Sequence, residues 1–195
     1  EFQTLWGRAD LEEELCGLTF RLSVPSFFQV NRDQTQRLYQ LALEFAGLTG
    51  AETVLDLYCG IGSITLVLAR QAKRVIGAEI VPEAVENAKE NARNNGISNA
   101  EFFLGDAGKI AARLAEERLC PQVVVVDPPR KGLAEETPEI IAGMGPERVV
   151  YVSCDPATLA RDVKRFGVLG YTVQRVQPVD LFPRTAHVET CVLLQ

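Results

Sequence analysis

Short apolar runs alternate with segments of helical periodicity through the middle of the chain. Runs of strand length lie at residues 53–58, 74–79, 101–106 and 122–127. Between these runs, apolar residues recur at helical spacing over 64–69, 84–95 and 110–119. The β-branched run at 122–127 predicts a strand that is covered on both faces. Alternating strands and helices predict a parallel, doubly wound sheet, which binds ligands beyond the carboxyl ends of its strands.

Three further strands are predicted in the C-terminal third of the chain. Residues 148–154 form an apolar run, after which Asp155 suits an N-cap and Pro156 the first position of a helix. Residues 170–178 and 185–194 predict two strands that close the sheet with an antiparallel edge. The predicted fold class is therefore α/β, with a doubly wound, mostly parallel sheet of seven strands.

The N-terminal region has a different pattern. Residues 18–24 alternate apolar and polar side chains after a turn at Gly17, which predicts a half-exposed strand that Pro25 ends. We interpret residues 1–24 as a remnant of a preceding or central domain and residues 25–195 as the main domain. Asn31 then precedes a helix that ends before Gly47, with an apolar face of Leu38, Leu41, Ala42, Phe45 and Ala46.

Acidic residues recur at the predicted strand ends. Two glycines, Gly60 and Gly62, follow the first strand and let the backbone approach a nucleotide-like ligand at a helix N-terminus. The next strand ends in Glu79, at the distance where such folds need an acceptor for ribose hydroxyls. The four strand-end acids, which together predict a binding site, are Asp56, Glu79, Asp106 and Asp127.

Three more features carry candidate chemistry. The prolines after Asp127 stiffen the exit from a central strand. Cys154 lies at a strand end beside a helix N-terminus, which favours a thiolate although Asp155 opposes it, and we predict a nucleophile there. His187 and Glu189 are expected to point from one strand face as a proton acceptor and its orienter. Gln29, held between aromatic residues and a helix entry, is a candidate pocket residue.

Composition narrows the class of protein. The chain has 195 residues, of which 47% are hydrophobic, and this content suffices for one sizeable core. Its net charge of −6 disfavours binding nucleic acid by bulk electrostatics, so any such contact is expected to be local. Five scattered cysteines argue against a metal site or a disulfide framework and favour a reduced, cytoplasmic setting. We find neither a membrane-spanning run nor a secretion signal.

The ordered motifs resemble those of the RNA uracil-5-methyltransferases. They are residues 27–31 (Phe-Phe-Gln-Val-Asn), 56–62 (Asp-Leu-Tyr-Cys-Gly-Ile-Gly), 127–130 (Asp-Pro-Pro-Arg), 152–161 (Val-Ser-Cys-Asp-Pro-Ala-Thr-Leu-Ala-Arg) and 187–189 (His-Val-Glu). The resemblance covers nearly the whole chain from about residue 18. It implies a Rossmann-like fold of the class I methyltransferase type and a C-terminal catalytic domain over residues 25–195.

The resemblance also implies a reaction and its residues. Such enzymes transfer a methyl group from S-adenosyl-L-methionine to C5 of a uridine in tRNA or rRNA. Cys154 would be the nucleophile and Glu189 the base. The cofactor would be bound by Gln29, Tyr58, Ser63, Glu79, Asp106 and Asp127, and local phosphate contacts would come from Arg130, Lys131, Arg161, Lys164, Arg165 and Arg184. No metal and no oligomer are expected. Family members commonly carry an N-terminal RNA-binding barrel and a central insert, many with an iron–sulfur cluster, and we expect both regions to be missing from this chain.

Three other functions share part of this pattern. A nicotinamide-dependent oxidoreductase would use the glycine turn and Glu79, but it favours a third glycine near position 65, where Thr65 stands. A methyltransferase acting on an amino group would not need Cys154. A non-catalytic partner in RNA modification would bind S-adenosylmethionine only structurally.

Overall fold

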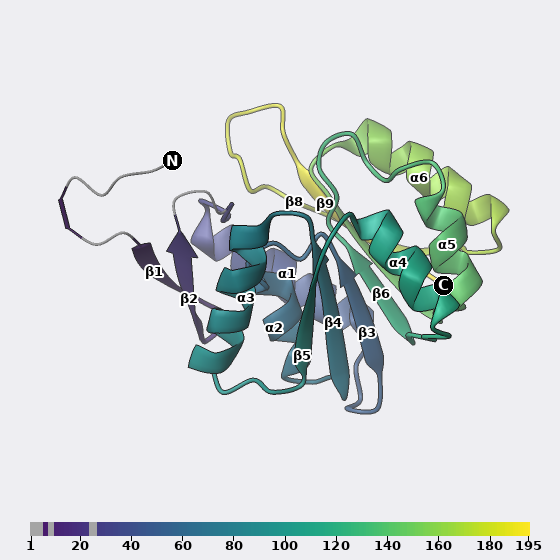
Figure 1. Cartoon of the computed structure of the whole chain (residues 1–195). Coiled ribbons are helices and arrows are strands. Elements are labelled where there is room, and N and C mark those ends of the chain that lie inside the picture. The colour runs from purple at the N-terminus through teal and green to yellow at the C-terminus, as the bar shows by residue number, and fades with distance from the viewer. Residues whose placement is uncertain (1–5, 8–9, 24–26) are drawn as a thin grey trace.

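A seven-stranded sheet forms the centre of the fold (Figure 1). The computed structural model describes residues 6–7, 10–23 and 27–195. Within them, the strand order of this sheet is β5-β4-β3-β6-β7-β9-β8. The strands are β3 (Thr53–Leu57), β4 (Arg74–Glu79), β5 (Ala100–Leu104), β6 (Val123–Val126), β7 (Arg148–Ser153), β8 (Val173–Val179) and β9 (Glu189–Leu194). Pairs among β3 to β7 are parallel, whereas β9 pairs antiparallel with both β7 and β8, so the predicted fold class is confirmed.

Helices cover both faces of the sheet, three on each (Figure 1). One layer consists of α1 (Arg32–Ala46), α2 (Ser63–Ala69) and α3 (Pro82–Asn94), and the other of α4 (Ala107–Glu116), α5 (Thr137–Met144) and α6 (Pro156–Val168). The side chains of β6 alternate between the two resulting cores: Val123 and Val125 face the first layer, and Val124 and Val126 face the second. The prediction that this strand is buried on both faces is therefore confirmed.

Two details differ from the sequence predictions. Helix α5 was not predicted, although Pro138 in its first turn and the left-handed Gly145 at its C-cap are recognisable helix signals. Helix α4 begins at Ala107, three residues earlier than expected, because the Asp106 carboxylate caps it by accepting a hydrogen bond from the amide of Lys109.

An antiparallel hairpin, β1 (Asp10–Leu15) and β2 (Leu18–Ser23), packs beside α3 (Figure 1). The strand predicted from residue 18 is present, whereas its partner β1 was not predicted, and the expected strand end at Val24 and Pro25 lies outside the described residues. Leu15, Leu18 and Phe20 are buried in the same apolar core as α1. The hairpin thus shares a core with the sheet.

The order in which strands are added to the sheet reverses between β3 and β6. Strands β4 and β5 lie on one side of β3, whereas β6 and β7 lie on the other. Loops that leave neighbouring strands at such a point diverge and open a crevice at the carboxyl edge. This edge lies at the top in Figure 1. None of the helices in the described part of the chain is long and apolar enough to cross a bilayer.

Truncation of Phe20 tests whether the hairpin is part of the core. Its ring is fully buried and lies 6.2 Å from the Phe28 ring. We expect Phe20→Ala to lower the free energy of unfolding by about 3–5 kcal/mol, because the variant loses apolar burial and leaves a cavity. Urea denaturation measures the change. The control is Leu11→Ala on β1, whose side chain is exposed, and equal stabilities of the two variants would contradict a shared core.

Candidate active site

The predicted site residues gather around one cavity at the carboxyl edge of the sheet. Its volume is about 600 Å³. The ends of β3, β4 and β5 and the segment before α1 contribute Gln29, Tyr58, Gly60, Glu79 and Asp106 to its lining. The segment after β6, the end of β7 and the region at the start of β9 contribute Asp127, Arg130, Lys131, Cys154, Phe182, His187 and Glu189. A single cavity therefore contacts both predicted groups of residues.

Ser63 and Asp56 are predicted binding residues that do not line this cavity. Both line a smaller adjoining pocket of about 50 Å³, together with Tyr39. The Ser63 and Tyr39 hydroxyl oxygens are 2.8 Å apart, so the side chain of Ser63 is held against α1. Gln29, Tyr58 and Asp127 line both pockets.

Glu79 is oriented by backbone amides around the glycine turn. Its carboxylate accepts hydrogen bonds from Gly60 at 3.0 Å, Ile80 at 2.8 Å and Val81 at 2.9 Å. The end of β4 is thereby tied to the turn after β3. Tyr58, which starts that turn, has a φ of +71°, a conformation rarely adopted by a non-glycine residue. Such local strain is common at ligand sites, where the surrounding structure enforces it.

Three carboxyl groups converge between β3 and β9. Asp56 is buried, and burial raises its pKa to about 7, with only the Thr65 hydroxyl donating to its Oδ2 at 2.5 Å. Its Oδ1 has no hydrogen-bond partner among the described residues. Burial also raises the pKa of Asp127 well above its usual value, and the Glu189 and Asp56 carboxylates add to that shift. Burial raises the pKa of Glu189 to about 6. Together, these three carboxyl groups favour the binding of protons or of a cationic ligand in this part of the site.

Cys154 follows β7 in a tight turn before α6. The Ser153 hydroxyl donates to the Asp155 carbonyl oxygen at 3.0 Å, and the Asp155 carboxylate caps α6 by accepting from the amides of Ala157 and Thr158. Burial raises the pKa of the Cys154 thiol, and Glu189 and Asp127 raise it further, while Arg130 opposes them. The thiolate expected at a helix N-terminus is therefore disfavoured here, because burial, together with the nearby carboxyl groups, raises the pKa of the thiol.

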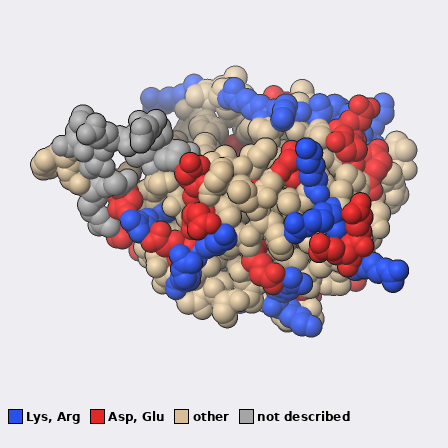
Figure 2. All heavy atoms as spheres, viewed as in Figure 1, with Lys and Arg blue, Asp and Glu red and all other residues tan. Residues whose placement is uncertain are grey.

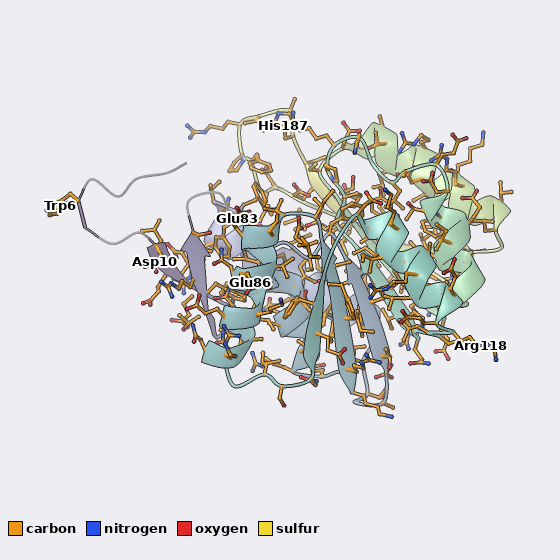
Figure 3. All side chains as sticks on the ribbon, viewed as in Figure 1. Trp6, Asp10, Glu83, Glu86, Arg118 and His187 are labelled. Atoms are coloured by element: carbon orange, nitrogen blue, oxygen red, sulfur yellow. The ribbon has the colours of Figure 1, made fainter. Side chains whose placement is uncertain are left out.

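The predicted pairing of His187 with Glu189 is wrong. Strand β9 begins only at Glu189, so the two residues do not share a strand face. His187 lies in the preceding loop, where its ring meets Phe182 edge-on at 6.3 Å and its Nε2 is 3.3 Å from Arg130 Nη2. Figure 3 shows it at the top of the molecule, outside the sheet. Glu189 itself is buried.

Sequence reasoning missed two residues near this site. Phe182 lies in a segment interpreted only as a connection, although it is the one aromatic residue there, and it lines the cavity. Asp162 is fully buried. It pairs with Arg161 and Arg165, two side chains predicted to contact phosphate. The available signal was Asp162 three positions before Arg165 on α6, because opposite charges at this spacing on one helix form ion pairs readily.

Comparison with known proteins shows the family. A family model described as tRNA (uracil-5-)-methyltransferase matches residues 10–195. The chain belongs to this family. Among its most similar curated relatives are uncharacterized RNA methyltransferases from Clostridium acetobutylicum and Lactiplantibacillus plantarum, which are 53% and 52% identical over 192 residues. These alignments cover 98% of this chain but 42% of each relative, so the chain spans less than half of their length.

A solved structure extends the comparison to the fold. The Pyrococcus abyssi tRNA (uracil-54, C5)-methyltransferase, in complex with S-adenosyl-L-homocysteine, superposes with a TM-score of 0.82 and is 32% identical. The match covers 97% of this chain and 45% of that chain. The predicted family and the methyltransferase type of fold are both confirmed.

The buried Asp56 carboxyl makes stability depend on pH in a predictable direction. Because burial raises its folded-state pKa to about 7, between pH 4 and 7 the folded chain keeps a proton that the unfolded chain has lost. Stability from this group is fully present below pH 4 and is lost as the pH rises through about 7. We expect Asp56→Asn to gain on the order of 1–4 kcal/mol relative to the wild type between pH 4 and 8.

Urea denaturation of both proteins across this pH range measures the difference. Asp33→Asn, on the exposed face of α1, is the control variant. Parallel pH dependences of wild type and Asp56→Asn would contradict the assignment.

Proposed function

We propose that this chain is the catalytic domain of an S-adenosyl-L-methionine-dependent RNA methyltransferase that methylates C5 of uridine through a covalent cysteine adduct. The observation that carries the proposal is the position of Cys154 and Glu189 in the same cavity as Glu79 and the glycine turn. The family and the solved P. abyssi relative support the same activity.

The β3–β4 side of the cavity has the chemistry that the cofactor requires. Glu79, aligned by three amides, offers carboxylate oxygens for ribose hydroxyls, and Ile80 beside it adds an apolar surface within the cavity. Buried Asp56 and half-buried Asp127 favour the positively charged end of such a molecule. When bound, the cofactor supplies an electrophilic methyl group. Gln29, Tyr58, Gly60, Ser63 and Asp106 complete the proposed binding residues.

Cys154 and Glu189 account for the steps that need a nucleophile and a base. C5 of uracil is a weak carbon nucleophile, so the Cys154 sulfur first bonds to C6 and the electron pair moves onto C5 and O4 as an enolate. After C5 has gained a methyl group, Glu189 accepts the C5 proton. The electrons of that C–H bond then form the C5–C6 double bond, and the C6–S bond breaks to release the thiolate.

The thiol must lose its proton before it attacks. Glu189 and Asp127 both raise the pKa of Cys154, so any positive charge that enters between them makes the thiolate easier to form. Arg130 already acts in this direction. The geometry therefore couples nucleophile activation to a filled cavity.

The carboxyl edge also offers local contacts for an RNA backbone. Figure 2 shows Lys and Arg side chains along the upper edge of the molecule, where the strands end. Arg130, Lys131 and Arg184 are exposed in the loops at this edge. Such side chains bind phosphates locally although the net charge is negative. A target uridine within folded tRNA or rRNA would have to flip out of its stack to reach Cys154.

Replacement of Cys154 tests the covalent mechanism. We expect the wild type, incubated with S-adenosylmethionine and RNA containing 5-fluorouridine, to form a stable adduct, because fluorine at C5 cannot leave as a proton. Cys154→Ala should form none, whereas Cys120→Ala, at an exposed site outside the cavity, should react as the wild type does. Intact-protein mass spectrometry detects the adduct. A methyltransferase acting on an amino group would methylate its substrate without Cys154, and that result would refute the mechanism.

Glu189 is tested by its pH dependence and by substitution. Because burial raises its pKa to about 6, release of the methylated product should accelerate as the pH rises through this value and level off above it. Glu189→Gln should slow this release by about 100-fold or more and accumulate the methylated adduct on unmodified RNA. Single-turnover mass spectrometry follows the adduct. A Glu189→Gln variant that releases product at the wild-type rate would exclude Glu189 as the base, and Glu147→Gln on the exposed opposite edge is the control.

A further inference from the structure

Helix α6 forms hydrogen bonds with Arg130, Lys131 and Leu133 in the turn that follows the two prolines, residues 130–133. The Thr158 hydroxyl donates to the Arg130 carbonyl oxygen at 3.1 Å. Arg161 Nη2 donates to the carbonyl oxygens of Lys131 at 2.9 Å and Leu133 at 3.2 Å. Thr158 and Arg161 lie three positions apart, so they belong to one face of the helix.

Asp162, on the buried side of α6, contacts the same turn. Its carboxylate is fully buried and accepts from the Leu133 amide at 2.8 Å and from the Tyr151 hydroxyl at 2.8 Å, both at Oδ2. Arg161 Nε donates to Oδ1 at 2.9 Å. A buried carboxylate is tolerated only when it is well paired. Here its hydrogen-bond partners come from α6, β7 and the turn, so the Asp162 carboxylate holds these three segments together.

Gly132 allows the turn to approach α6 closely. Its φ is +72°, and a Cβ there would lie 2.5 Å from both Arg161 Nη2 and Asp162 Oδ2. No side chain fits between the turn and this ion pair, so the approach depends on glycine.

The hydrogen bonds between α6 and the turn at residues 130–133 join two walls of the cavity. Arg130 starts the turn, and its guanidinium lines the cavity beside His187. Cys154 lies two residues before the start of α6, the helix that carries Asp162. A shift of the turn relative to α6 would therefore change where Arg130 lies relative to the sulfur. Small misplacements of this kind have large effects on rate.

We propose that Asp162, together with Arg161 and Thr158, acts as a positioning residue that holds Arg130 in place against Cys154 during catalysis. The role rests on the proposed function of the cavity. It requires no contact between Asp162 and either ligand.

Asp162→Asn tests the proposal. The asparagine oxygen can still accept from Leu133 or Tyr151, but its NH₂ group faces the Arg161 guanidinium, donor against donor, so Arg161 should release the turn. We expect kcat for RNA methylation to fall about 10–100-fold. The dissociation constant for S-adenosylmethionine, measured by calorimetry, should stay within about threefold, because none of the proposed cofactor residues lies on α6 or in the turn at residues 130–133. Amide hydrogen exchange at Leu133 should accelerate.

Glu52→Gln is the matched control. Glu52 is also a buried carboxylate that accepts backbone hydrogen bonds, from Thr49, Gly50 and Ala51, but it lies at the amino end of β3. Its loss should lower the thermal unfolding temperature and leave kcat within about twofold of the wild type. A folded Asp162→Asn protein with unchanged kcat would overturn the proposal. So would a fall in kcat that Glu52→Gln reproduces at equal loss of stability.

A second variant covers the case in which Asp162→Asn does not fold. Thr158→Val removes the hydroxyl that holds the Arg130 carbonyl and leaves the ion pair intact. We expect a several-fold fall in kcat at an unchanged unfolding temperature, and an unchanged kcat would overturn the proposal. Failure of the proposed function is separate, since it would appear as a wild type that neither methylates RNA nor forms the 5-fluorouridine adduct. In that case Leu133 exchange still reports whether Asp162 holds the turn.

Discussion

Burial of β3, β6 and β7 on both faces is the constraint on which the rest of the structure depends. These strands place apolar side chains alternately in two cores, and each core needs its own layer of helices. Each strand must therefore be followed by a crossover that leaves from the carboxyl edge. Polar residues are excluded from the strand interiors, so they accumulate where the strands end. The cavity is a consequence of this arrangement, since it opens where the connections from β3 and β6 diverge.

Burial also determines the electrostatics of the site. Asp56, Asp127 and Glu189 lie close enough for their charges to interact, and burial raises the pKa of each. Carboxylates that are buried close together destabilise a folded protein unless they bind protons or a cation. Burial also raises the pKa of the Cys154 thiol, and Glu189 and Asp127 raise it further. The proposed nucleophile, the proposed base and the proposed cofactor side are thus electrostatically coupled, because they share one poorly solvated volume.

Polar contacts at the cavity wall and behind it hold the connections in place. Glu79 ties the glycine turn to β4, and Asp162 ties the turn at residues 130–133 to α6. Both carboxylates accept backbone amides from a segment distant in sequence. Each carboxylate therefore fixes the position of a loop that lines the cavity. A site assembled from several strand ends requires such fixed loops.

The fold class, the family and most residues that line the candidate cavity could be predicted from the amino-acid sequence alone. Strand and helix periods are local, and Asp56, Glu79, Asp127 and Cys154 could be placed at one edge because parallel strands end on the same side. Tertiary structure decided what depends on contacts between distant segments. It separated His187 from Glu189 by starting β9 late, turned the balance at Cys154 against the thiolate, and buried Asp162 against a turn some 30 residues away in sequence. Burial and the distance between charges are set by packing, and no periodicity along the chain encodes them.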